Sequence, residues 1–146
     1  MKKDIDFIWD EESGIATCLI PWDDNIDIIG TSICCEEDQD MKSEKTGMHI
    51  AEKRATIGYL KAIRDNEIKP QLKILKQFYY SINQSKQFNS KSYEARMLNR
   101  QIKMLEEGLD YVKKNIKANQ KDLSNYINEK EKFYTFVRKG RKAKEN

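Results

Sequence analysis

The sequence predicts an α+β fold, in which a small N-terminal three-stranded antiparallel sheet is followed by long, kinked C-terminal α-helices. Short runs rich in isoleucine fill the first 35 residues and are separated by turn residues. Beyond them, apolar residues recur three and four positions apart along most of the chain. Only 6 glycines and 2 prolines occur in 146 residues, which favours a helix-rich chain. The length suits one core, so we assign residues 1–146 to a single domain.

Residues 1–37 predict a β-meander. Its strands are expected at residues 5–9, 15–20 and 26–35. The first turn, "DEESG", ends in Gly14, where a positive φ is expected, and the second, "PWDDN", is rich in residues that hydrogen-bond their own backbone. Three short strands must bury one face against another element, and the helices that follow can supply it.

Residues 38–82 predict a first long helix. Asp38 or Asp40 is expected to cap it, because aspartate accepts hydrogen bonds from the first free N–H groups. Pro70 lacks an N–H group, so we expect a kink or break near residue 70. Its apolar stripe includes Ile50, Ile57, Leu60 and Ile63.

Residues 83–92 are polar and predict a linker, and residues 93–138 predict a long C-terminal helical segment. Its apolar positions step by four and three over more than five heptads, with Asn119 and Lys130 as polar interruptions. This periodicity needs a partner helix, whereas a break near "KANQKDLSN" would produce a helical hairpin instead. Residues 139–146 are expected to form a frayed basic tail. The stripe comprises Leu98, Ile102, Leu105, Leu109, Val112, Ile116, Leu123, Tyr126, Phe133 and Val137.

Charge is distributed unevenly along the chain. Residues 1–40 hold 12 acidic side chains and two lysines, a balance of −10, whereas residues 41–146 carry +13. Two interpretations remain open: the acidic and basic halves face each other, within a chain or between protomers, or the basic half attracts a phosphate-bearing partner.

Targeting signals and metal motifs are not evident. No apolar run approaches the roughly 20 residues that cross a bilayer, and the first residues lack a signal-peptide core, so we expect no membrane association and a cytoplasmic location. Three cysteines, Cys18, Cys34 and Cys35, are expected to be reduced. They lack the spacing of a zinc site, and we expect no metal and no cofactor.

The sequence shows no set of residues typical of a catalytic site, and we expect that the protein is not an enzyme. It holds one histidine and none of the hydrolase, zinc-protease or phosphate-loop motifs. Acidic side chains near the strand ends are an alternative site for magnesium and phosphodiester cleavage, although such charges usually serve as solvated caps.

Basic residues mixed with aromatic ones are the stronger candidates for a site. Guanidinium groups bind phosphate oxygens, and flat rings stack on bases. The alternative is that the rings belong to the core and the arginines to its rim. The candidate ligand-binding residues are Arg54, Tyr59, Lys61, Arg96, Asn99, Arg100, Phe88 and Trp22.

Two quoted stretches carry a resemblance to a known family. "SGIATCLI", followed by "IIGTSICCEEDQDMKSEKTGMHIAEKRA", gives two strands, an acid-rich joint, "SExTG" and "IAEKRA". This pattern resembles the Thoeris anti-defence proteins of phages and prophages, most clearly over roughly residues 7–65. The match places Arg54 at the "RA" arginine and the joint at Ser43, Glu44, Thr46 and Gly47. The same joint also looks like small double-stranded-RNA-binding-like domains.

The resemblance implies a binding protein that acts in the cytoplasm of an infected bacterial host. Members of the family form dimers or higher assemblies and hold glycosyl cyclic ADP-ribose between subunits. Sequestering this signal silences Thoeris defence. Some members also hold cyclic trinucleotides at a separate site. Two other hypotheses remain: a nucleic-acid-binding module, which the scattered basic residues make the weaker idea, and a coiled-coil adaptor without a small ligand.

Overall fold

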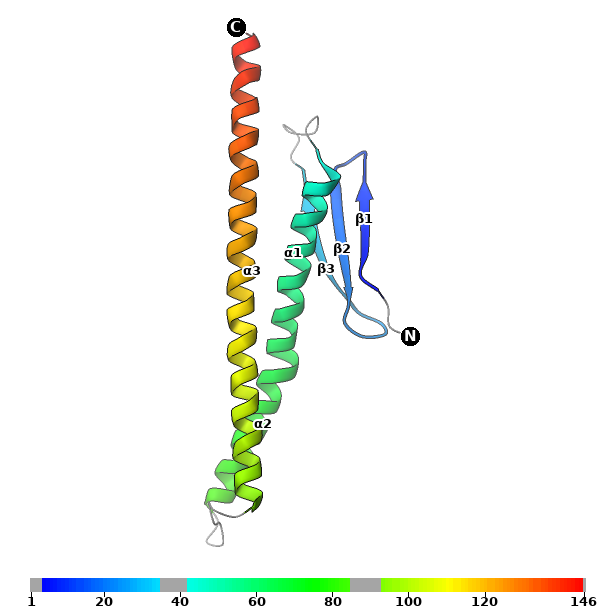
Figure 1. Ribbon diagram of the computed structural model, residues 1–146. Coiled ribbons are helices and arrows are strands. Elements are labelled where there is room, and N and C mark those ends of the chain that lie inside the picture. The colour runs from blue at the N-terminus through cyan, green and yellow to red at the C-terminus, as the bar shows by residue number, and fades with distance from the viewer. Residues whose placement is uncertain (1–3, 35–41, 85–92, 146) are drawn as a thin grey trace. The chain divides into compact units, whose positions relative to one another are not determined.

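The computed structural model describes residues 4–34, 42–84 and 93–145 and has the predicted α+β fold (Figure 1). Where the sequence predicts one domain, the chain divides into two compact units. We call Met1–Tyr59 with Lys117–Asn146 the sheet unit, and Leu60–Ile116 the helical unit. The elements are β1 (Asp6–Asp10), β2 (Ile15–Pro21), β3 (Asp27–Ile33), α1 (Glu44–Ala62), the π-helix η2 (Ile63–Ile68), α2 (Lys69–Asn83) and α3 (Tyr93–Glu145).

The sheet is an antiparallel meander in the order β1-β2-β3. Gly14 ends the first turn with the predicted positive φ, 72°, and its N–H donates to the carbonyl of Asp10. In the second turn the Asp23 carboxylate accepts the backbone N–H groups of Asn25 and Ile26, at 2.8 and 2.7 Å. Local hydrogen bonds, between backbone groups in the first turn and to a side chain in the second, therefore define both turns.

One face of the sheet packs against α1 through small residues. Ala16 and Cys18 of β2 and Ala51 and Ala55 of α1 are fully buried. A Cβ atom added at Gly30 of β3 would overlap backbone atoms of Ala51 and Ala55, so only glycine permits this approach. Burial raises the pKa of the Cys18 thiol, with a smaller contribution from Glu52.

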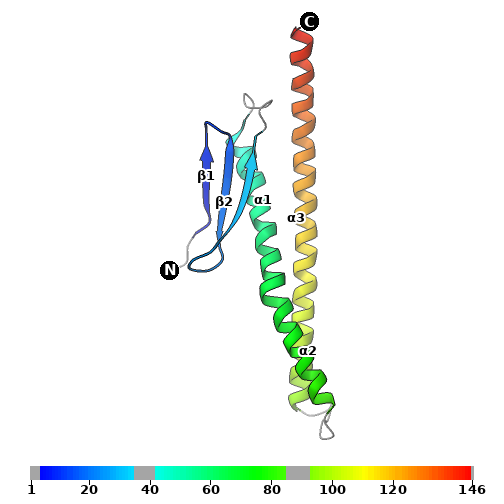
Figure 2. The same ribbon diagram turned by 180° about the vertical axis from the view of Figure 1, so that it is seen from behind.

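The opposite face of the sheet is apolar and exposed. The pairing register places Ile8, Ile29 and Ile33 there, with exposed fractions of 55%, 60% and 69%. Figure 2 shows the sheet turned by 180°, from the side away from α1. In the part of the chain that the structure describes, this face has no covering element.

The cap of α1 differs from the prediction. The helix begins at Glu44, and the Ser43 hydroxyl accepts the N–H group of Thr46 at 3.3 Å. Ser43 is therefore the capping residue, because the helix begins later than the predicted residue 38. Asp38 and Asp40 lie outside the described residues.

In the helical unit, the irregularity expected near Pro70 is a π-helical segment. The Lys69 N–H group donates to the carbonyl of Arg64, five residues back, and α2 begins at Lys69. Pro70 thus lies in the first turn of α2, where a missing N–H group costs little. The π-helical turn η2 precedes Pro70, and it takes the place of the break that was predicted near residue 70.

Helix α3 continues from Tyr93 to Glu145, without a break at "KANQKDLSN" and beyond residue 138, where a frayed tail was predicted. Lys142 and Lys144 in its last turn favour the helix terminus electrostatically. Helix α3 contacts the chain's own helices: Lys76 of α2 pairs with Glu106 in the helical unit, and in the sheet unit the His49 ring of α1 lies 4.1 Å from the Tyr126 ring, tilted by 37°.

The apolar stripe of α3 drifts around the helix. Phe133, predicted to belong to it, is 56% exposed, whereas Lys130 and Tyr134 are half-buried. A straight helix has 3.6 residues per turn, so its inward face rotates by about 20° per heptad relative to a 3.5-residue repeat. Over several heptads this drift moves Phe133 outward and Tyr134 inward.

Candidate functional site

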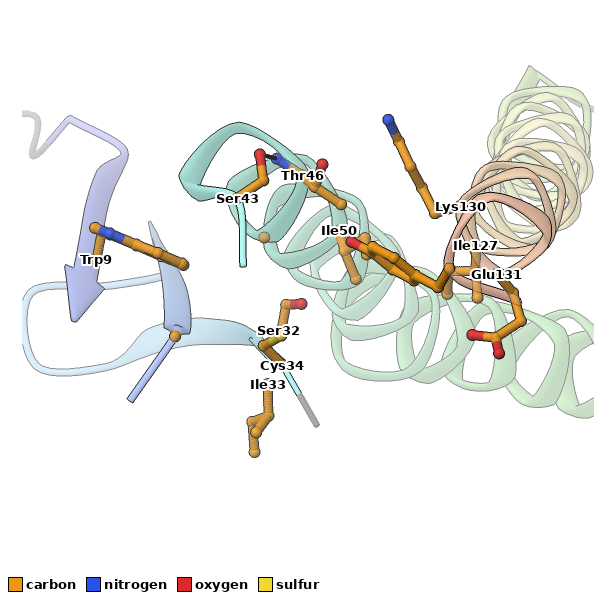
Figure 3. Close-up of a pocket in the computed structure, with 13 residues that line it drawn as sticks. Trp9, Ser32, Ile33, Cys34, Ser43, Thr46, Ile50, Ile127, Lys130 and Glu131 are labelled. Atoms are coloured by element: carbon orange, nitrogen blue, oxygen red, sulfur yellow. Dashed lines mark hydrogen bonds between the residues drawn. The ribbon is translucent and has the colours of Figure 1, made fainter. Parts of the chain in front are cut away.

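The sheet unit contains a cavity of about 220 Å³ beside the first two turns of α1. Its walls come from the end of β3, from α1 and from the C-terminal part of α3 (Figure 3). Ser43, Thr46 and Gly47, three residues of the "SExTG" joint, line it. Residues that directly follow the change from acidic to basic sequence therefore form a wall of this cavity.

Sequence reasoning missed the residues that α3 contributes to the cavity. Lys130 and Tyr134 line it, and the Lys130 ammonium lies 5.4 Å from the centre of the Tyr126 ring. The one sign of this in the sequence was that Lys130 interrupts the apolar stripe of α3. Asn119, the other interruption, also faces inward, since it accepts a hydrogen bond from Lys53 at 3.1 Å.

Two of the predicted site residues meet in the sheet unit. The rings of Trp22 and Tyr59 contact each other edge to face, with centroids 5.5 Å apart. Both side chains are half-buried, and they come from the β2–β3 turn and from α1. This pair leaves aromatic surface at which a flat ring can stack.

Arg54 has a structural contact that the sequence did not predict. Its Nη1 donates to the carbonyl oxygen of Thr31 on the edge strand β3, at 2.7 Å. The side chain remains exposed, and a guanidinium group has five N–H donors. Arg54 thus links α1 to the sheet while retaining donors for an anion.

The helical unit brings together Arg96, Asn99 and Arg100, which are exposed on the first turns of α3. The Asn99 amide donates to the hydroxyl group of Tyr79 on α2, at 3.4 Å. Among the described residues, neither arginine forms an ion pair, although they lie one helical turn apart. Like charges at this spacing destabilise a helix slightly, and an anion between them would reverse that effect.

Lys61 belongs to the same unit and is exposed, but its neighbour Arg64 is already paired. The Arg64 guanidinium donates to both carboxylate oxygens of Asp65, at 2.8 and 3.1 Å. Hydrogen bonding from Arg64 holds the pKa of the Asp65 carboxyl below its ordinary value.

The predicted site residues thus fall into two groups. Trp22, Arg54 and Tyr59 belong to the sheet unit, and the helical unit holds Lys61 with the α3 residues. Phe88 lies outside the described residues.

Within residues 4–34, 42–84 and 93–145, no three histidine, cysteine or acidic side chains gather into a metal site. No helix in these ranges is both long and apolar enough to cross a membrane. The chain matches no protein-family model, no curated protein and no solved structure.

Proposed function

We propose that this protein binds the signalling nucleotide glycosyl cyclic ADP-ribose and sequesters it without cleavage. In this role it is a phage-encoded inhibitor of Thoeris defence that acts in the cytoplasm of the infected bacterium. The observation that carries the proposal is the pair Arg96 and Arg100, which lie one turn apart without an ion-pair partner among the described residues. Two guanidinium groups at this spacing are suited to a pyrophosphate.

Two further observations support the proposal. The resemblance over roughly residues 7–65 includes the joint whose Ser43, Thr46 and Gly47 line the cavity of the sheet unit. Within the sheet unit, and separately from the arginines of the helical unit, the Trp22–Tyr59 pair offers aromatic surface on which a nucleobase can stack.

Self-association is part of the proposal, as a homodimer or higher homo-oligomer. Ile8, Ile29 and Ile33 expose an apolar sheet face that a second copy would cover. The cavity of about 220 Å³ is also smaller than the roughly 300–1,000 Å³ of pockets that enclose drug-sized ligands. A second protomer would supply the missing wall.

Ligand recovery tests the proposal. The pure protein is incubated with glycosyl cyclic ADP-ribose, unbound nucleotide is filtered away, the retained protein is heated, and the released material is analysed. We expect intact nucleotide in near-stoichiometric amount. The double variant Arg96→Ala/Arg100→Ala should weaken binding at least about 100-fold, because each charge-assisted hydrogen bond contributes about 1.5–3 kcal/mol.

Lys114→Ala is the matched control, because Lys114 lies on the same helix but already pairs with Asp110 at 3.1 Å. It should leave retention unchanged. Altered nucleotide would identify an enzyme, and absence of retention would overturn sequestration of this ligand. Binding to many nucleic acids that falls steeply with salt would instead identify a nucleic-acid-binding module.

A further inference from the structure

Ser32 is a buried polar residue without a partner at the cavity of the sheet unit. It lies on β3, is only 8% exposed, and is the single buried polar side chain among the described residues. The structure gives its hydroxyl group no hydrogen bond to any described residue. Since no fully buried side-chain polar atom in those residues lacks a partner, the Ser32 oxygen is open to the cavity, and Figure 3 shows it directed into the space between β3 and α1. A hydroxyl group that opens only into the cavity can hydrogen-bond to a ligand there.

One end of the cavity favours negative charge. Ser43 and Thr46 lie at the start of the 19-residue helix α1. The Thr46 N–H group already donates to the Ser43 hydroxyl, and the N–H groups of Glu44 and Lys45 remain without a partner within the helix. The Lys130 ammonium forms no ion pair with a described carboxylate. In Figure 3 it extends to the same side of the cavity as Ser43 and Thr46.

Among the described residues, the acidic groups nearest the cavity do not cancel this charge. Glu131 also lines the cavity, but its carboxylate pairs with Arg138 at 2.9 Å. Glu44, in the first turn of α1, is exposed and is not part of the lining.

The remaining wall is apolar and includes an aromatic ring. Trp9, Ile50 and Ile127 line the cavity, and a Cβ atom added at Gly47 would lie 3.1 Å from the Trp9 ring, so this ring packs closely on α1. The cavity volume of about 220 Å³ is several times the roughly 30 Å³ that one water occupies, so a phosphate group fills only part of it. There is room for a ring beside the anion.

We infer that this cavity binds a phosphomonoester with a ring substituent. Lys130, Ser43 and Thr46 hold the phosphate, the Ser32 hydroxyl donates to one of its oxygens, and the ring packs on Trp9 and Ile50. The inference shares this cavity with the proposed function but uses none of the arginines to which sequestration is assigned. Titration with phenyl phosphate and recovery of glycosyl cyclic ADP-ribose can therefore fail separately.

Calorimetric titration of the full chain tests the inference, with phenyl phosphate, phenol and inorganic phosphate as probes. Phenyl phosphate should bind at least about tenfold more tightly than either of the other two probes, because only it engages both ends of the cavity. Lys130→Gln and Ser32→Ala should each weaken it by about tenfold. Lys132→Gln, an exposed lysine on the same helix, should leave binding unchanged.

Three results would overturn the inference: phenol or inorganic phosphate binding as tightly as phenyl phosphate, unchanged affinity in both cavity variants, or no detectable heat with phenyl phosphate. Far-UV circular dichroism of each variant confirms that a loss of affinity is not a loss of fold. Quenching of Trp9 fluorescence in a Trp22→Phe background locates the ring independently.

Discussion

The sheet unit and the helical unit are stabilised by different kinds of contact. In the sheet unit, β3 meets α1 backbone to backbone, through Gly30 against Ala51 and Ala55. In the helical unit, the buried residues include larger side chains, such as Leu72 of α2 and Leu98 of α3. Backbone contact leaves no side chain that can move aside, whereas long side chains can repack. The first unit should therefore tolerate little change in volume, and the second should tolerate more.

Gly30→Ala should have the largest effect. Its new methyl group would overlap the backbone of α1, so we expect a loss of about 3 kcal/mol in the free energy of unfolding. Chemical denaturation measures it. The control is Gly108→Ala in the helical unit, where a Cβ atom meets nothing within 4 Å. There alanine should stabilise α3 by up to about 1 kcal/mol. Equal effects of the two substitutions would refute the comparison.

Leu72→Ala should come next, with a loss of about 2–3 kcal/mol, because Leu72 is only 7% exposed and its removal leaves a cavity that neighbouring side chains partly fill. Hydrogen exchange should show the loss of protection in the helical unit. Ile74→Ala, two residues away and 64% exposed, should change stability by less than about 0.5 kcal/mol. A similar loss in both variants would mean that burial does not distinguish these positions.

Ion pairs should have the smallest effects and sharpen the comparison. Lys53 donates to Asn119 and lies 3.7 Å from Asp122, and its side chain is 27% exposed. Lys53→Ala should cost about 0.5–1 kcal/mol and depend on salt concentration. Lys76 pairs with Glu106 at 3.0 Å but is 55% exposed, so Lys76→Ala should cost less than about 0.5 kcal/mol. Thermal melts at low and high salt measure both losses, and a larger loss for Lys76→Ala would contradict this ranking.

Features that depend on neighbours in sequence could be predicted. The turns at Gly14 and Asp23 arise from local backbone geometry and local hydrogen bonds, and the sheet, its order and the helical remainder follow from periodicity. The predicted cap of α1 was wrong. Asp38, Asp40 and Ser43 are all residue types that cap helices, and only the folded helix shows where its first turn begins.

Features that depend on distant residues were not accessible from the sequence. Arg54 contacts Thr31 across 23 positions, and no local pattern indicates that contact. Lys130 interrupted an apolar stripe, and only the rotation of α3 shows that it lines a cavity. The grouping of Arg96, Asn99 and Arg100 was visible because their spacing is helical, but their separation from Trp22 and Tyr59 into another unit was not.

The discontinuity of the sheet unit has a consequence for synthesis of the chain. Residues 60–116 form a contiguous stretch, so the whole helical unit leaves the ribosome before the sheet unit is complete. The sheet and the start of α1 emerge earlier but must wait for residues 117–146. Until Lys130 and Tyr134 have been translated, the open side of α1 faces solvent and the cavity does not exist. Any binding activity of this cavity therefore appears last during translation, and a nascent chain is inactive at this site however early its sheet has formed.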